Sequence, residues 1–314
     1  MKNFKLLKKT SVLIALFMFV NSCVDYDDNL RYVGELVIIE ESPNDPKEQG
    51  LAEGLCSFTE SPEILSTLLI NPNLPSTVDL SPMMPPVRSQ GGQGSCVAWA
   101  TTYYMKSYHE KKQYGYDYTD YATVMSPAFV YNQIKVSDNC SLGSCIESAL
   151  HLLKTKGVPT WLEFPYNQAN CSVPPDQLQL TLALNHKNSR SFVISSETII
   201  DNHIYSQKDI IKNLLYLENP VIIGIKIDIN FSHSTPLNSN DEYIYNSYNS
   251  SQNYGNHAML IVGYDNTLQA FKVVNSWGSA WGNEGYCWIS FNFFKLLSDA
   301  DYQIGLLGAF TAYD

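Results

Sequence analysis

Basic residues are scarce in this chain. Its 314 residues include 20 lysines and arginines against 31 aspartates and glutamates, which gives a net charge of −11. A protein that binds nucleic acid or an anionic surface needs a basic patch, so we expect neither as a partner. The sequence also lacks a glycine-rich phosphate loop followed by lysine, and no spacing of its cysteines and histidines predicts a metal site. We therefore expect no cofactor.

Long apolar runs are missing near the N-terminus. The run Val12–Val20 follows four lysines and is too short for a comfortable transmembrane helix, an order typical of an export signal. Asn21 and Ser22 then lead into Cys23. Residues 1–22 resemble a bacterial lipoprotein signal peptide, after which Cys23 would be lipidated and become the mature N-terminus. Asn21 departs from the usual motif, and an ordinary secretory signal is the alternative; both interpretations export the protein.

A glycine-rich loop in the middle of the chain leads into a cysteine. The loop Gln90–Ser95 contains three glycines, and Cys96 follows it directly. The next stretch, Val97–Lys112, has few helix breakers and ends near Gly115, so it predicts a helix with one buried stripe. A thiol at a helix N-terminus is favoured as the thiolate. Taken alone, however, this pattern also fits an ordinary buried cysteine.

The remaining pattern predicts helices in the first half and strands in the second. Helices are expected over 128–135, after a capping Ser126 and Pro127, and over 146–156. A further helix is expected over 208–218, capped by Ser206. Strands are expected at 191–194, 198–200, 221–228, 243–245, 258–264, 272–277 and 285–289. The two halves together indicate an α+β fold.

Three segments combine into one pattern. Gln90 lies six residues before Cys96, His257 lies 161 residues after Cys96, and Asn275 follows 18 residues later within Asn-Ser-Trp-Gly. In this order they resemble the papain-like cysteine peptidases, family C1. The resemblance implies a two-lobe fold, with a mainly helical lobe, a β-barrel-like lobe and the active-site cleft between them. It covers residues 73–314, which we expect to form the peptidase domain.

The resemblance implies a role for each residue of this pattern. Cys96 would be the nucleophile and His257 the cation beside it, later the acid that protonates the leaving amine. Asn275 would orient the imidazole, and Trp277 would shield their hydrogen bond from water and line the substrate site. The Gln90 side chain and the Cys96 backbone N–H would form the oxyanion hole. The expected partner is a peptide or protein substrate.

The chain departs from the family pattern at several positions. Gln93 replaces a cysteine that usually forms a disulfide, and Ile146-Glu147-Ser148 stand where a Gly-Gly pair usually binds substrate backbone. Gly224 and Gly255 match positions that line the main specificity pocket, and we expect that pocket to prefer large apolar or aromatic side chains. Cys171 is expected to pair with Cys140 or Cys145, Cys287 to be a buried free thiol, and the pairing of Cys56 stays open.

Residues 23–72 contain little that could build a core. Up to residue 55, nine acidic residues stand against two basic ones, and Pro43, Pro46 and Gly50 break any long element. Two roles fit: an acidic tether that lifts the domain from a membrane, or a short pro-segment that covers the cleft. The acidic run after Cys23 favours the tether and resembles that of surface lipoproteins. We therefore expect an exported, membrane-anchored lipoprotein, at the outer membrane or the cell surface.

The pattern supports more than one function. The first is peptide-bond hydrolysis through a thioacyl-enzyme at Cys96. A second is a catalytically silent papain-fold protein that binds peptides or a surface. A third is acyl transfer to an amine, as in transglutaminases or transpeptidases. The presence of Gln90, Cys96, His257 and Asn275 together favours an enzyme, and no feature of the sequence predicts the oligomeric state.

Overall fold

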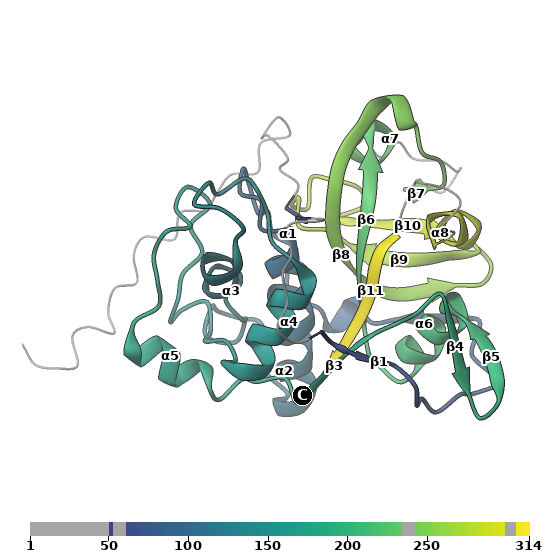
Figure 1. The fold of residues 1–314 in the computed structure, drawn as a ribbon, viewed down its shortest axis with the longest axis horizontal. Helices are drawn as coiled ribbons and strands as arrows, with labels where there is room; N and C mark the ends of the chain where they lie inside the picture. Colours follow the sequence, from purple (N-terminus) through teal and green to yellow (C-terminus); the bar gives the residue numbers. More distant parts are fainter. Residues whose placement is uncertain (1–49, 53–60, 234–242, 299–305) are drawn as a thin grey trace, which may run out of the picture. The chain divides into compact units, whose positions relative to one another are not determined.

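The computed structural model describes residues 50–52, 61–233, 243–298 and 306–314 (Figure 1). The predicted signal peptide, Cys23 and most of the predicted tether lie outside the described residues. By its contacts the chain divides into two units, Met1–Glu40 and Glu41–Asp314, and the second contains all the described residues. In that part of the chain, no helix is both long enough and apolar enough to cross a membrane.

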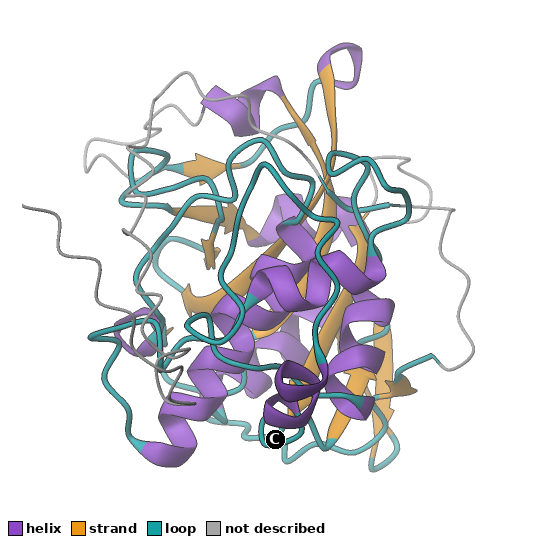
Figure 2. Cartoon of the chain, turned by 90° about the vertical axis from the view of Figure 1, so that its left-hand side faces the viewer, coloured by secondary structure: helices purple, strands orange, loops and turns teal. Residues whose placement is uncertain are grey.

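The α-helices of residues 96–183 gather in one part of this unit, whereas the α-helices of residues 207–298 pack against the strands (Figure 1). The helices are η2 (Ser81–Met83), α1 (Cys96–Ala98), η3 (Trp99–Lys106), α2 (Ser107–Tyr114), α3 (Pro127–Ile134), α4 (Ile146–Thr155), α5 (Gln177–Ala183), α6 (Gln207–Tyr216), α7 (Ile229–His233), η4 (Ser250–Gln252) and α8 (Phe291–Ser298). The strands are β1 (Glu63–Ile64), β2 (Thr77–Asp79), β3 (Arg190–Val193), β4 (Glu197–Ile200), β5 (His203–Ser206), β6 (Val221–Asp228), β7 (Ile244–Tyr245), β8 (Asn253–Asp265), β9 (Ala270–Val274), β10 (Tyr286–Ser290) and β11 (Leu306–Tyr313). Helices α1 to α5 lie on the left of Figure 1, and Figure 2 shows helices in front of the strands.

One continuous helix runs from Cys96 to Gly115. It begins as α1, widens into the π-helical segment η3 and ends as α2 at Gly115, whose φ of 72° is the left-handed conformation of a helix end. The predicted helix is confirmed. The predicted single buried stripe is wrong, because every residue from Cys96 to Glu110 is buried. The helix packs against α3 and α4 and also against β6 and β8, so it has no solvent face in this stretch.

The other predicted helices begin where the capping residues indicated. Ser126 Oγ accepts a hydrogen bond from Phe129 N at 3.1 Å at the start of α3, and Ser206 caps α6 in the same way. Helix α5 was not predicted from its apolar pattern. It begins with a capping box, in which Asp176 and Gln179 each accept a hydrogen bond from the other's backbone N–H.

The main sheet is mostly antiparallel and carries the buried strands of the second half. Its strand order is β1-β3-β11-β6-β8-β9-β10-β7, with β2 paired to β8. All the strands predicted from sequence are present, and β6 and β8 are its apolar centre. In the described residues the sheet is open, which corrects the expected barrel-like closure. Its end strands, β1 and β7, have only two residues each and pair with one neighbour.

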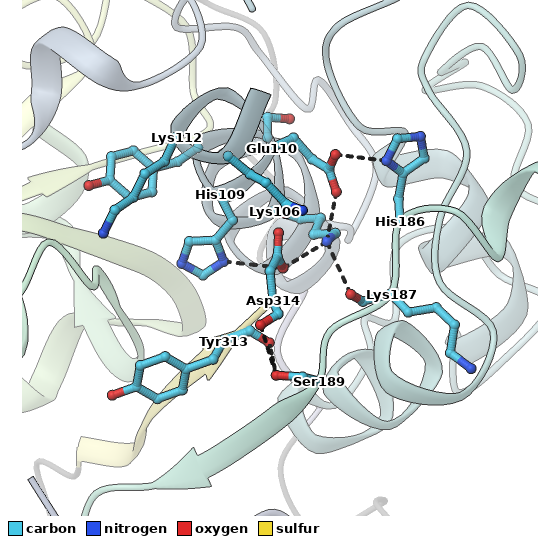
Figure 3. Close-up of polar contacts among 12 residues, drawn as sticks. Lys106, His109, Glu110, Lys112, His186, Lys187, Ser189, Tyr313 and Asp314 are labelled. Atoms are coloured by element: carbon cyan, nitrogen blue, oxygen red, sulfur yellow. Dashed lines mark hydrogen bonds and ion pairs between the residues drawn. The ribbon is translucent and has the colours of Figure 1, made fainter. Parts of the chain in front are cut away.

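A buried cluster of charged side chains ties the end of the sheet to the central helix (Figure 3). Lys106 Nζ of η3 lies 2.8 Å from Glu110 and 2.7 Å from Asp314, which follows β11. The second Glu110 oxygen lies 2.8 Å from His186 Nδ1. Since buried charges are tolerated only when they are paired, this cluster fixes the position of η3 relative to β11.

The described cysteines follow the expected pattern. Cys140 and Cys171 form a disulfide, with a Cα–Cα distance of 5.7 Å, which selects one of the two expected pairings. Cys145 is also disulfide-bonded. Cys96 and Cys287 are free and buried, so the expectation for Cys287 is confirmed. Cys23 and Cys56 lie outside the described residues.

Candidate active site

The first residue of α1 meets strand β8. Cys96 Sγ accepts a hydrogen bond from the backbone N–H of Ala258 at 3.4 Å, and Ala258 directly follows His257. Cys96 and Ala258 are 162 positions apart in sequence. Packing of the central helix on the sheet therefore brings the predicted nucleophile beside the predicted histidine, and both side chains are fully buried.

The imidazole of His257 is held by the residue that follows strand β9. His257 Nε2 lies 2.7 Å from Asn275 Oδ1, and because an amide oxygen only accepts, Nε2 carries the hydrogen. The same oxygen also accepts from Ser276 N at 2.8 Å, which fixes the amide. No described residue hydrogen-bonds to His257 Nδ1. This nitrogen is therefore the one placed to exchange a proton with Cys96.

Aromatic side chains enclose the His257–Asn275 hydrogen bond. The Trp277 ring lies 4.8 Å from the His257 ring, centroid to centroid, and is 5 % exposed. Phe231 packs against Trp277 and Trp281 at 5.4 and 5.0 Å. The shielding expected of Trp277 fits this geometry. Contact of Trp277 with substrate stays a prediction.

Phe231 is a part of the site that the sequence reading missed. It lies in the short helix α7, which no sequence pattern predicted. Asp228 fixes it there: its carboxylate is fully buried and accepts hydrogen bonds from Phe231 N at 3.2 Å and from Tyr245 OH at 2.9 Å. Asp228 thus caps the start of α7.

Gln90 lies in the same loop as Cys96, with its amide fixed at both ends. Its Oε1 accepts from Ser276 Oγ at 2.5 Å, and its Nε2 donates to Gln93 O at 2.8 Å. Its backbone N–H donates to Ser276 O at 2.8 Å. The amide NH₂ therefore faces the loop that ends at Cys96, and its part in the oxyanion hole stays a prediction.

Residues Gly50–Ala52 lie over this site; we call them the cover segment. Ser144 N donates to Gly50 O at 2.7 Å, and Ala52 N donates to Ser144 O at 3.0 Å, as in a parallel β-bridge. Leu51 N donates to Asn256 O, next to His257, at 3.4 Å. Gly50 packs so closely on the Gly94 carbonyl that a Cβ at position 50 would lie 1.8 Å from that oxygen.

The side chain of Leu51 fills the space beside Gly224. A Cβ on Gly224 would lie 2.5 Å from Leu51 Cδ2 and 3.3 Å from Ile146 Cδ1. Gly224 therefore leaves room for an apolar side chain, as expected for a specificity position. Gly255 lies on β8 opposite Ile227, and its part in the pocket stays a prediction.

Burial changes the expected protonation of the pair. Desolvation raises the pKa of Cys96 to about 11, although the Ala258 and Gly50 backbone N–H groups oppose the shift, and desolvation lowers the pKa of His257 to about 4. Burial of both groups therefore disfavours a thiolate beside an imidazolium and favours the neutral thiol and the neutral imidazole.

The buried imidazole makes folding stability depend on pH. In the unfolded chain the pKa of His257 is near 6.5, whereas in the folded protein it is about 4. The contribution of the neutral imidazole to the free energy of unfolding is therefore complete above pH 6.5 and is lost as the pH falls from 6.5 to 4. From pH 7 to pH 5 it accounts for a loss of about 2 kcal/mol in the free energy of unfolding.

Urea unfolding at the two pH values tests this. In His257→Gln, which keeps an N–H donor for Asn275, we expect the fall in the free energy of unfolding from pH 7 to pH 5 to be about 2 kcal/mol smaller than in the wild type. The exposed His203 supplies the control, since His203→Gln should lose as much as the wild type. Equal losses in all three proteins would contradict the assignment of the shift to His257.

The described residues contain no cluster of three or more histidine, cysteine or acidic side chains that could hold a metal ion. The chemistry of the site is that of a thiol, an imidazole and two carboxamides. Gln90, Cys96, His257 and Asn275 are all brought together, as the sequence predicted. The residues that it missed are Phe231, Ser276 and the cover segment.

Comparison with known proteins places this geometry in a family. The model of the papain family cysteine proteases matches residues 74–300. Among similar proteins, gamete and mating-type specific protein A of Dictyostelium discoideum is 28 % identical over 218 residues, which are 67 % of this chain and 41 % of that protein. The thiol protease aleurain of Arabidopsis thaliana is 26 % identical over 220 residues, 68 % of this chain and 55 % of that protein. The chain thus spans about half the length of these relatives.

Solved structures share the fold. Xylellain, a cysteine protease from Xylella fastidiosa, superposes with a TM-score of 0.64 at 20 % identity and covers 86 % of this chain and 97 % of its own. Digestive procathepsin L 3 from the larval midgut of Tenebrio molitor superposes with a TM-score of 0.59 at 18 % identity, covering 85 % of this chain and 76 % of its own.

Proposed function

Because the chain belongs to the papain family of cysteine proteases, we propose that it hydrolyses peptide bonds through a thioacyl-enzyme on Cys96. The observation that carries this proposal is the 2.7 Å contact between His257 Nε2 and Asn275 Oδ1. It orients the imidazole so that Nδ1 is available to the thiol. A peptide-binding protein without turnover would have no need of this orientation.

The proposed reaction has two halves. His257 Nδ1 takes the Cys96 proton while Sγ attacks the substrate carbonyl carbon, and the Gln90 amide and the Cys96 N–H stabilise the oxyanion. The imidazolium then protonates the leaving amine as the C–N bond breaks, which leaves a thioester. Water, deprotonated by His257, attacks the thioester and returns the acid product and the free thiol.

A peptide library tests hydrolysis against its alternatives. Digestion in ¹⁸O-labelled water, with products identified by mass, is expected to give fragments with one ¹⁸O at each new carboxyl group. Ligated peptides would indicate acyl transfer to an amine instead. Bound but intact peptides would indicate a binding protein.

We propose that the cover segment is part of a pro-segment that lowers the activity of the site without abolishing it. Three contacts support this: Ser144 with Gly50 and Ala52, Leu51 with Gly224, and Gly50 with Gly94. A substrate would need the space that these three residues occupy. On this proposal residues 23–72 are both a tether and a pro-segment, rather than a tether alone.

We also propose that residues 1–22 direct export and that Cys23 carries a lipid, which anchors the protein to a bacterial membrane, at the outer membrane or the cell surface. The lysines, the short apolar run and the small residue before Cys23 support this. We expect the wild type to enter the detergent phase in a Triton X-114 separation and Cys23→Ser to stay aqueous. Cys287→Ala serves as the thiol control. A wild type found in the aqueous phase would favour the ordinary secretory signal.

A further inference from the structure

The proposed oxyanion hole needs its two hydrogen-bond donors, both from one loop, at a fixed separation. They are the Gln90 side chain and the Cys96 N–H, six residues apart across a loop with three glycines. The loop from Gln90 to Ser95 contains no cysteine, so no disulfide within it can hold this separation. Contacts with other segments must hold it instead.

The hydroxyl of Tyr166 joins the two ends of this loop. It donates to Gln90 O at 2.8 Å, and it lies 2.7 Å from Ser95 Oγ. Since its hydrogen goes to Gln90 O, its oxygen accepts from Ser95. Burial raises the pKa of Tyr166, so the phenol keeps the hydrogen that it donates.

Neighbours of Tyr166 hold the middle of the same loop. Gly92 N donates to Gln168 Oε1 at 3.0 Å, and Gln93 Nε2 donates to Asn167 O at 3.2 Å. The loop that carries these residues ends at Cys171, whose disulfide with Cys140 anchors it. Cys140 O in turn accepts from Gly94 N at 2.7 Å. Gly92 and Gln93 thus contact the segment that ends at Cys171, and Gly94 contacts Cys140 on the other side of the same disulfide.

We propose that Tyr166 is a positioning residue for the oxyanion hole, because its hydroxyl fixes the distance between Gln90 and the Ser95–Cys96 peptide. The proposal rests on the proposed peptidase function. Tyr166 touches neither the thiol nor the imidazole by any described hydrogen bond, so its loss should affect oxyanion stabilisation and not thiol reactivity. Oxyanion donors act only when they are held in place before the reaction.

Tyr166→Phe in the full chain tests this with two reagents. A peptide aldehyde forms a hemithioacetal whose oxygen occupies the oxyanion position, whereas iodoacetamide alkylates the thiol without forming an oxyanion. We expect kcat and the aldehyde affinity each to fall about tenfold, with KM and the alkylation rate of Cys96 within twofold of wild type. Tyr108→Phe is the control, since its hydroxyl donates to a backbone carbonyl, Glu218 O, at 3.0 Å and takes no part in the glycine loop.

Two results would overturn the proposal. One is a Tyr166→Phe protein with unchanged kcat and aldehyde affinity. The other is an equal fall in the aldehyde affinity and the alkylation rate, since general loosening of the loop would cause it. A wild type that neither hydrolyses peptides nor binds the aldehyde would overturn the proposed function as well, so the two failures are distinguishable.

Discussion

Cys96→Ala is expected to lower kcat/KM for peptide hydrolysis at least about 10⁴-fold. Among the described side chains, the Cys96 thiol is the nucleophile that packing places beside His257, and alanine can form no covalent bond to the substrate carbonyl. The fold should persist, since alanine removes a single atom from a packed position. Initial rates with a fluorogenic peptide, together with the thermal unfolding midpoint, measure both.

The matched control is Cys287→Ala. Cys287 is the other free, buried cysteine among the described residues, and it lies on β10 opposite Val273 of β9. Its replacement should leave kcat/KM within a factor of about two. Equal losses in the two variants, or activity retained without Cys96, would show that another group is the nucleophile.

Leu51→Asp is expected to raise kcat/KM of the full chain about tenfold to a hundredfold. The half-buried Leu51 side chain lies against Gly224 and Ile146, and a carboxylate partly desolvated there without a partner would cost about 1–3 kcal/mol. Since about 1.4 kcal/mol corresponds to a factor of ten, the cover segment should leave the site. Water then reaches Cys96 and His257, and the pKa of Cys96 should fall from about 11.

Leu69→Asp is the control for this variant. Leu69 belongs to the same N-terminal stretch, but its side chain is 74 % exposed, so an aspartate there changes little. The pH dependence of Cys96 alkylation gives an independent readout of uncovering. Unchanged hydrolysis and an unchanged alkylation profile in Leu51→Asp would contradict the inhibitory role of the cover segment.

The sequence predicted the centre of the fold better than its edges. Long apolar runs such as β6 and β8 are specified by burial on both faces, and Ser126 and Ser206 mark helix starts by their own hydrogen bonds. Helix α5 was missed although Asp176 and Gln179 form a readable capping box. The full burial of the central helix could not be predicted, because it depends on how α3, α4 and the sheet pack around it.

In the candidate site, too, some features could be predicted from the sequence, whereas others depend on contacts between distant segments. Gln90, Cys96, His257 and Asn275 were predicted because their spacing matches a family, and the structure brings them together. The contacts of Leu51 and Tyr166 were not predicted, since they join segments far apart in the chain: Leu51 with Gly224, and Tyr166 with Gln90. No periodicity or motif reports such long-range contacts. Burial of Cys96 and His257 opposes the thiolate expected from sequence, and this burial arises from the packing of distant segments.

The most direct test is the mass of the enzyme during turnover. The full chain and its Cys96→Ala variant are mixed with an activated peptide ester, quenched in acid, and digested for peptide mapping. We predict an adduct with the mass of the acyl group on the peptide that contains Cys96, formed and lost during turnover and absent from the variant. Ester and peptide hydrolysis that continues with no adduct on Cys96, or with an adduct on another residue, would contradict the account.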